Sequence, residues 1–148
     1  MKKFFCTATG VIGGAIAAAM GGVDELAKAL LWAMFFDYFS GWLVATVFHQ
    51  SPKTESGAYA SDVGLKGLIR KAMIFGIVCM AENMDGVLGI AYLRDATIIG
   101  FLCNEGMSIA ENLGLMGLRL PKPFIAALDV LADKANIDTP GPTEKKSE

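Results

Sequence analysis

The chain has 148 residues, of which 53% are hydrophobic and 19% are charged. Soluble domains carry about 25% charged residues, so this chain is poor in charge and rich in apolar residues. Such a composition excludes intrinsic disorder, collagen and a coiled coil as descriptions of the whole chain. The net charge of −2 argues against a nucleic-acid partner, which needs a basic surface.

Four segments of 20 to 23 residues carry no more than two charged residues each. About 20 helical residues cover the hydrocarbon layer of a bilayer, which is roughly 30 Å thick. The sequence therefore predicts an all-α membrane protein with four transmembrane helices, and a three-span protein is the alternative. The predicted helices lie at about 4–23, 27–48, 68–93 and 96–118.

Two other interpretations concern these apolar segments. A soluble helical bundle would have shorter, amphipathic helices, whereas residues 4–23 have no polar side chain on any face beyond Thr7 and Thr9. Lys2 and Lys3 before an apolar run also resemble a cleavable signal peptide, but the run is long for a signal core and favours an uncleaved anchor. Whether the fourth helix spans the bilayer or lies at its interface stays open.

Lysine and arginine predict the topology, because they are enriched in cytoplasmic loops. With four spans, 11 of the 13 fall on one side, and only Lys28 and Arg94 fall on the other. Both termini are then cytoplasmic. A transmembrane domain at 1–118 contains a cytoplasmic loop at 49–66, and a cytoplasmic tail follows at 119–148.

The tail divides into two parts. Residues 121–136 fit a short amphipathic helix, with Phe124, Leu128 and Leu131 at helical spacing. Residues 138–148 contain a Pro-Gly-Pro string followed by charges, which is typical of disorder.

Small residues recur every fourth position in the first helix. In lipid, such faces allow helix backbones to approach closely, so they predict self-association or a tight helix pair. A generic signal anchor rich in alanine and glycine is the alternative. The candidate packing residues are Gly10, Gly14, Ala18, Gly22 and, in the second helix, Gly41.

Polar residues within the predicted spans are the main functional candidates. An ionised acid at the bilayer centre costs roughly 2.5–3.5 kcal/mol on the insertion scale, so these side chains should turn inward, pair, become hydrated or become protonated. They either line a water-filled passage or form an internal hydrogen-bond network that fixes packing. The candidates are Asp37, Glu82, Asp85, Asn104, Glu105, Ser108, Glu111 and Asn112.

Helical phase groups several of these residues. The five candidates in the fourth helix fall within an arc of roughly 120°, and Glu82 and Asp85 share a face of the third helix because they are three residues apart. Lys66, Arg70 and Lys71, at the start of the third helix, are expected to anchor the topology on the cytoplasmic side and to meet anionic lipid headgroups.

Enzymatic chemistry is not indicated. The single histidine, His49, lies in a polar loop, and the three cysteines are dispersed in apolar segments without metal-ligand spacing. We expect no catalytic residue, no metal site and no cofactor.

Several strings resemble the bacteriophage holins of the toxin-secretion/phage-lysis family. They are DYFSG at 37–41, GLKGLIRK at 64–71, Asp85, the more specific NEGMSIAEN at 104–112, and then Gly117 and Pro121. The order and spacing resemble that family over about 30–131. Leu118 and Arg119 depart from it where another proline is often found, and the first helix and the Pro-Gly-Pro tail are not diagnostic.

The resemblance implies that the protein forms homo-oligomeric lesions in the host inner membrane. Such lesions release a cell-wall hydrolase, or in some relatives a toxin, and collapse the membrane potential. A stable ion channel or transporter subunit and a non-permeabilising scaffold are the alternatives. The acids are expected to be protonated or bonded to one another before assembly and hydrated afterwards.

Overall fold

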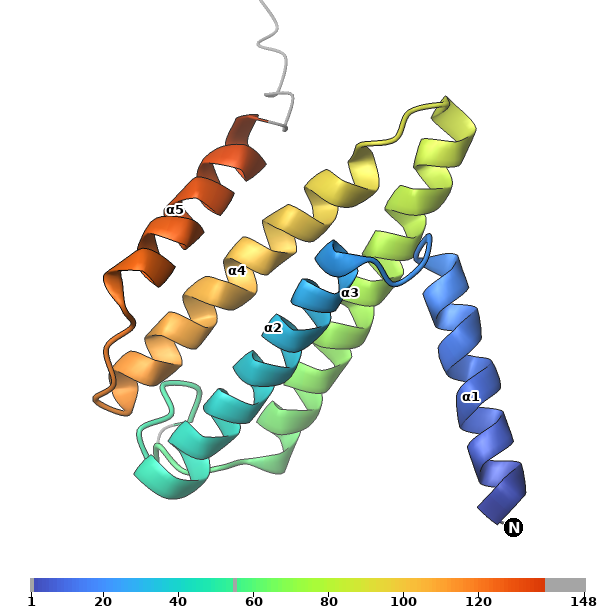
Figure 1. The fold of residues 1–148 in the computed structure, drawn as a ribbon. Coiled ribbons are helices and arrows are strands. Elements are labelled where there is room, and N and C mark those ends of the chain that lie inside the picture. The colour runs from blue at the N-terminus through green and yellow to red at the C-terminus, as the bar shows by residue number, and fades with distance from the viewer. Residues whose placement is uncertain (1, 55, 138–148) are drawn as a thin grey trace, which may run out of the picture.

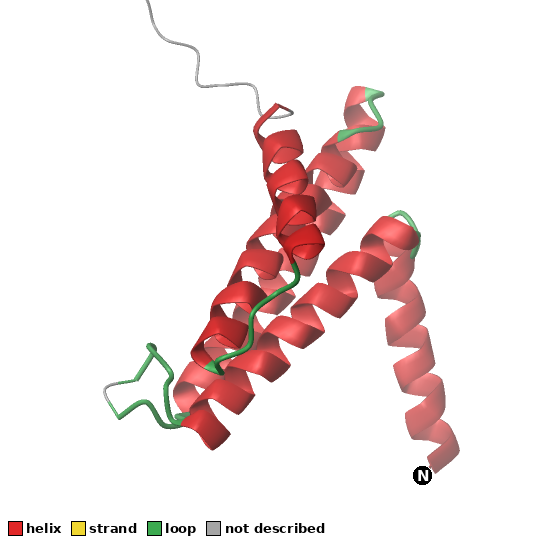
Figure 2. Ribbon diagram, turned by 60° about the vertical axis from the view of Figure 1, so that its left-hand side comes forward, coloured by secondary structure: helices red, strands yellow, loops and turns green. Residues whose placement is uncertain are grey.

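The structure is a computed structural model that describes residues 2–54 and 56–137. Within these residues the chain is helical and contains no strand, as Figure 2 shows. The elements are α1 (Lys2–Ala19), α2 (Glu25–Leu43), the π-helical turn η1 (Val44–Phe48), α3 (Ser61–Leu88), α4 (Leu93–Leu115) and α5 (Lys122–Ile137). The all-α prediction is therefore confirmed, and α5 occupies the segment expected to form a short amphipathic helix.

The helices α2, α3 and α4 form a bundle, and α4 is its central member. Helix α4 packs on α2, α3 and α5, whereas α1 contacts the bundle only lightly through α3. Figure 1 shows α1 and α5 at opposite edges of the molecule. The core is built from apolar residues of the α1–α2 turn and of α2, α3 and α4: Met20, Ala27, Leu30, Met34, Ile74, Val78 and Ile98.

Capping side chains set where two helices begin. Asp24 accepts a hydrogen bond from the backbone N–H of Ala27 at 2.8 Å and so caps α2. Asp85 accepts hydrogen bonds from the backbone N–H groups of Leu93 and Arg94 at 3.0 and 2.9 Å and satisfies the start of α4. An acceptor at a helix N-terminus replaces the missing intrahelical partners.

The helix bounds differ from the sequence-based ones at several ends, and α3 ends at Leu88, five residues before the predicted end at 93. Helix α1 ends at Ala19, four residues early, since Gly21 and Gly22 have positive φ. Helix α3 begins at Ser61 rather than near 68, so part of the predicted 49–66 loop is helical. Helix α4 begins at Leu93, three residues early, because Asp85 caps it across the turn. The predicted disorder at 138–148 lies outside the described residues.

One helical segment among the described residues meets the length and hydropathy expected of a membrane span. It is Glu25–Phe48, with 24 residues and a mean hydropathy of 1.4, and it joins α2 to η1. Only 28% of its most apolar 18-residue stretch is buried within the chain, so most of this segment is exposed at the surface.

Candidate functional site

A charged network joins the three bundle helices. Lys71 of α3 lies with its Nζ atom 2.8 Å from Oδ2 of Asp37 on α2, and it also pairs with the carboxylate of Glu105 on α4. Lys71 is 9% exposed and Glu105 is 3% exposed. One ammonium group therefore ties two acids of neighbouring helices together inside the bundle.

Asn112 and Ser40 extend this network along the bundle. The Asn112 side-chain amide donates to Ser40 Oγ at 2.9 Å and to Asp37 Oδ1 at 3.3 Å. It also lies 3.4 Å from the Asp37 carbonyl oxygen. Across the described residues, every buried side-chain nitrogen and oxygen has a hydrogen-bond partner. We call Asp37, Ser40, Lys71, Glu105 and Asn112 the Lys71 network.

The Lys71 network holds two carboxylates and one ammonium, so it carries a formal charge of −1 when all three are ionised. A cavity of about 110 Å³ adjoins it and is also lined by Ser108 and by Tyr59 and Arg70 near the 51–60 loop. The network therefore borders a space wide enough for water, on the side of the bundle where α2 ends and α3 begins.

A second charged group lies where the α1–α2 and α3–α4 turns meet. The guanidinium of Arg94 donates from Nε to the Met20 carbonyl oxygen at 2.6 Å and from Nη1 to Asp24 Oδ2 at 2.8 Å. Nη1 also bonds Asp95 at 2.8 Å, and Glu82 lies 3.7 Å from Nε. We call Asp24, Glu82, Arg94 and Asp95 the Arg94 clamp, because Arg94 joins two turns that are about 70 residues apart in the chain.

The clamp shifts the pKa values of Asp24 and Arg94. The hydrogen bond from Arg94, followed by the one from the Ala27 backbone, lowers the pKa of Asp24 from 3.8 to about 2. The hydrogen bond to Asp24 raises the pKa of Arg94 above its ordinary value. Both groups are therefore charged across the physiological pH range.

The predicted polar residues separate into two sets. Asp37, Glu105 and Asn112 meet in the Lys71 network, while Asp85 caps α4 and Glu82 lies beside Arg94. Ser108 is half-buried and Asn104 is exposed, and both line the cavity, whereas Glu111 is exposed and does not line it. The acids of the spans are thus not bonded to one another: the buried ones are held by a lysine or by backbone N–H groups.

The two basic residues at the centres of these groups were not recognised as partners from the sequence. Lys66 and Arg70 are exposed and their anchoring role stays a prediction, whereas Lys71 is buried. Helical phase was the usable signal, because Lys71, Ile74, Val78, Ala81 and Asp85 share one buried face of α3. For Arg94, the sequence predicts only a place on the side opposite the cytoplasm.

The predicted packing positions Gly10 and Gly14 of α1 face open space within the part of the chain that the structure describes. A Cβ atom added at Gly10 or Gly14 would meet nothing within 4 Å, and Ala18 is exposed. Gly22 lies beyond the end of α1. A Cβ at Gly41 would lie 3.6 Å from Asn112 Nδ2, which places α2 close to α4 there. Self-association through α1 stays a prediction.

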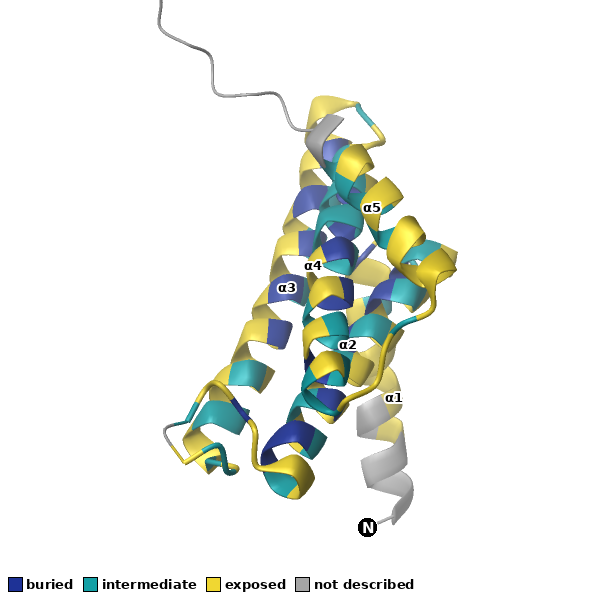
Figure 3. Cartoon of the chain, turned by 90° about the vertical axis from the view of Figure 1, so that its left-hand side faces the viewer, coloured by how far each residue is buried: buried dark blue, intermediate teal, exposed yellow. Residues whose placement is uncertain are grey.

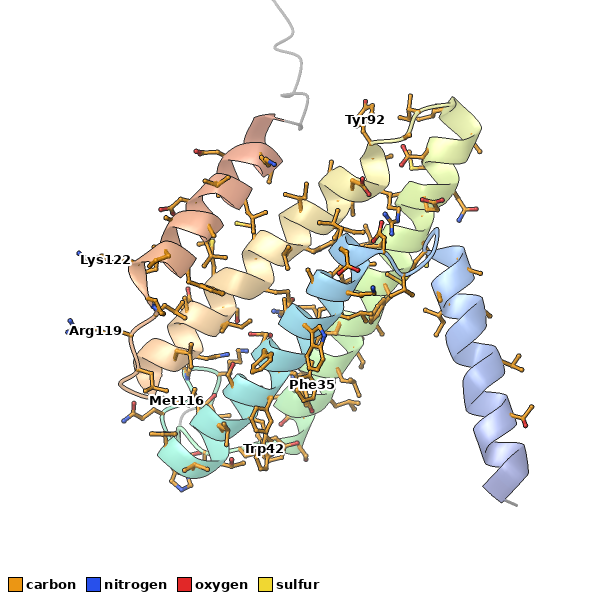
Figure 4. All side chains as sticks on the ribbon, viewed as in Figure 1. Phe35, Trp42, Tyr92, Met116, Arg119 and Lys122 are labelled. Carbon is orange, nitrogen blue, oxygen red and sulfur yellow. The ribbon has the colours of Figure 1, made fainter. Side chains whose placement is uncertain are left out.

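Aromatic side chains cover the outer face of α2. Phe35 and Phe39 stack with ring centroids 6.1 Å apart, and Phe39 stacks on Trp42 at 6.2 Å. Trp32, Phe35 and Phe36 are more than half exposed. Figure 4 shows Phe35 and Trp42 on the side of α2 that faces away from α5.

No group of three or more His, Cys, Asp or Glu side chains suited to a metal ion occurs in the described part of the chain.

Comparison with known proteins identifies several relatives of this chain. The chain is 36% identical to an uncharacterised protein of Listeria monocytogenes over 116 residues, covering 76% of this chain and 77% of the relative. It is 34% identical to an uncharacterised protein of Halalkalibacterium halodurans over 137 residues, covering 88% and 96%. A probable holin of Bacillus phage phi105 is 33% identical over 66 residues, covering 44% of this chain and 49% of the relative.

No solved structure matches the chain significantly. A family model described as the bacteriophage holin family matches residues 14–133, a stretch that contains α2, α3 and α4 and both charged groups. The chain belongs to the bacteriophage holin family.

Proposed function

We propose that this protein is a holin, which accumulates in the inner membrane of a bacterial host and assembles with copies of itself into holes. The holes release a cell-wall hydrolase, or a toxin, and permeabilise the membrane. The observation that carries this proposal is the family match over 14–133. The role needs no catalytic residue, because permeability itself is the activity.

The proposed topology has four spans and both termini in the cytoplasm. The 11-to-2 distribution of basic residues supports it. The Arg94 clamp supports it independently, since the α1–α2 and α3–α4 turns, both assigned to the outer face, contact each other. Reporter domains fused after residues 23, 55, 91 and 148 test this topology. Only the fusions after 23 and 91 should place the reporter on the outer side of the membrane, and the other two should leave it in the cytoplasm.

Burial of charge supports membrane insertion of the bundle. Asp85 and Glu105 are buried, Asp37 is half-buried, and all three are bonded, while most of the large exposed side chains of α2 and α3 are apolar. An unpaired ion at the bilayer centre costs roughly 2.5–3.5 kcal/mol on the insertion scale. Pairing through Lys71 lowers this cost for two helices at once.

Assembly is proposed to change the surroundings of these acids. The Lys71 network leaves one negative charge uncompensated, and water admitted between neighbouring copies would stabilise that charge better than the interior of a single bundle does. Hydration of the network would then favour the assembled state. This step explains why a holin can keep acids in its spans without a permanent pore.

Inducible expression in bacteria tests the function against its two rivals. A holin should arrest growth abruptly, admit a membrane-impermeant dye and release a co-expressed cytoplasmic enzyme. A stable channel or transporter subunit would leave cells viable, with small ion conductance and no enzyme release. A scaffold would cause none of the three effects, and either of these last results would overturn the proposal.

A further inference from the structure

The bundle has two chemically different sides. The outward faces of α2 and α3 carry large apolar side chains such as Trp32, Phe36, Met73 and Met80, each more than half exposed. On the opposite side, α4 is covered by α5 (Figure 1), and Figure 3 shows the outer face of α5 as largely exposed. One side thus suits acyl chains, and the character of the other depends on α5.

Helix α5 packs on α4 through Leu128, whose side chain occupies the space beside Gly106. A Cβ atom added at Gly106 would lie 2.3 Å from Cδ2 of Leu128, so the space that a side chain at 106 would fill is occupied by Leu128. Cys103 Sγ lies 3.9 Å from the Leu128 carbonyl oxygen. Six residues connect the helices, so α5 runs back along α4 in the opposite direction.

The exposed surface of α5 combines charged side chains with the apolar side chains of Phe124, Ile125 and Val130. Lys122, Asp129, Asp133 and Lys134 are all exposed. At 1.5 Å per residue, Asp129 lies about 10 Å and Asp133 about 17 Å along the helix from Lys122. Because Leu128 contacts Gly106 in the middle of α4, these acids lie beside the middle of α4 and not beside its end.

We infer that α5 stays docked on α4 in the assembled hole and forms its water-facing wall, with Asp129 and Asp133 in contact with the aqueous lumen. This inference rests on the proposed function, under which α4 spans the bilayer. Charges beside the middle of a spanning helix cannot face lipid without a large cost, but they can face water. The wall then comes from a helix of 16 residues, which is too short to span the bilayer by itself.

A disulfide between α4 and α5 tests whether docking is compatible with hole formation. Leu128→Cys in a Cys6→Ser, Cys79→Ser background places a thiol near native Cys103. The full chain is purified, oxidised and reconstituted in vesicles of phosphatidylethanolamine and phosphatidylglycerol that contain a dye and a small enzyme. Mass spectrometry after reduction and differential alkylation measures the fraction of chains that carry the crosslink.

The inference predicts that crosslinked and reduced protein release the enzyme equally, within about twofold, because α5 does not leave α4. Release about tenfold lower in the crosslinked form, restored by reduction, would overturn it and would mean that α5 must undock. Failure of the reduced protein and of the unmodified chain to release either marker would instead remove the proposed function.

A second pair of variants tests the wall without a crosslink. Asp129→Leu with Asp133→Leu makes the outer face of α5 apolar, whereas Asp129→Asn with Asp133→Asn keeps it polar at nearly the same size. We expect about tenfold less enzyme release from the Leu pair and release near wild type from the Asn pair, at equal vesicle insertion. Equal release from the two pairs would overturn the inference.

Discussion

The Lys71 network and the Arg94 clamp both surround one basic residue with acids, but they differ in what the base contacts. Lys71 bonds only to carboxylates, which lie on two other helices. Arg94 bonds to backbone carbonyl oxygens as well as to acids, and its partners Asp24 and Asp95 are about half exposed. The first is a buried charge cluster within the bundle, and the second is a partly hydrated join between two turns.

This difference determines what happens when the base is removed. Without Lys71, the carboxylates of Asp37 and Glu105 lose their counter-charge inside the bundle, where only the small adjoining cavity offers room for water. Without Arg94, the half-exposed Asp24 and Asp95 turn toward solvent. Only the backbone carbonyl groups of the α1–α2 turn then lose a hydrogen-bond partner. The structure therefore assigns helix association within the bundle to Lys71 and the placement of α1 to Arg94.

The largest effect is expected from Lys71→Met. It leaves Asp37 and Glu105 as unpaired buried acids, and breaking such a pair costs about 3–5 kcal/mol. Thermal unfolding in detergent and the amount of protein in the membrane measure this loss. The triple variant with Asp37→Asn and Glu105→Gln should recover most of it. A single variant as stable as wild type would contradict the network.

Replacing Arg94 with lysine should have a smaller and more local effect. Lysine keeps the charge but cannot reach Met20 O and Asp24 Oδ2 together, so the first turn loses buried hydrogen bonds worth about 1–3 kcal/mol. Protease cleavage at the α1–α2 turn should become faster. Arg70→Lys is the matched control because Arg70 is exposed, and equal cleavage in the two variants would refute the clamp.

Glu105→Gln and Glu111→Gln compare a buried and an exposed acid of the same helix. Neutralising Glu105 leaves Lys71 balanced by Asp37 and stabilises the unassembled bundle, so lysis after induction should begin later. Exposed Glu111 lies outside the network and should give near wild-type timing at equal protein level. Identical timing in the two variants would mean that the charge of the network does not control assembly.

The smallest effect concerns the pH dependence of the clamp. Since the pKa of Asp24 is lowered from 3.8 to about 2, its stabilising contribution is complete above pH 3.8 and is lost as pH falls through about 2. Asp24→Asn keeps the helix cap but removes this contribution. Unfolding temperatures of the two proteins should converge only in that acidic range, and a constant difference down to about pH 2 would contradict the ion pair.

Patterns of one residue type predicted much of the molecule. The segments poor in charge indicated where the helices lie, and the spacing of Phe124, Leu128 and Leu131 predicted α5. The phase of residues 104–112 placed Glu105 and Asn112 on a common side of α4. These predictions hold because helical periodicity depends on neighbours in the sequence. The string at 104–112 likewise indicated the family that the comparison then showed.

Pairing between distant residues could be decided only by the tertiary structure. Lys71 and Arg94 looked like topology signals in the sequence, yet they lie 34 and 70 residues from the acids Asp37 and Asp24 that they bind. The seat of Leu128 at Gly106 is equally non-local. Local composition determined which segments are helical and where charge is scarce, whereas the packing of α4 between α2, α3 and α5 decided which charges meet, because a charge takes its partner from space and not from sequence.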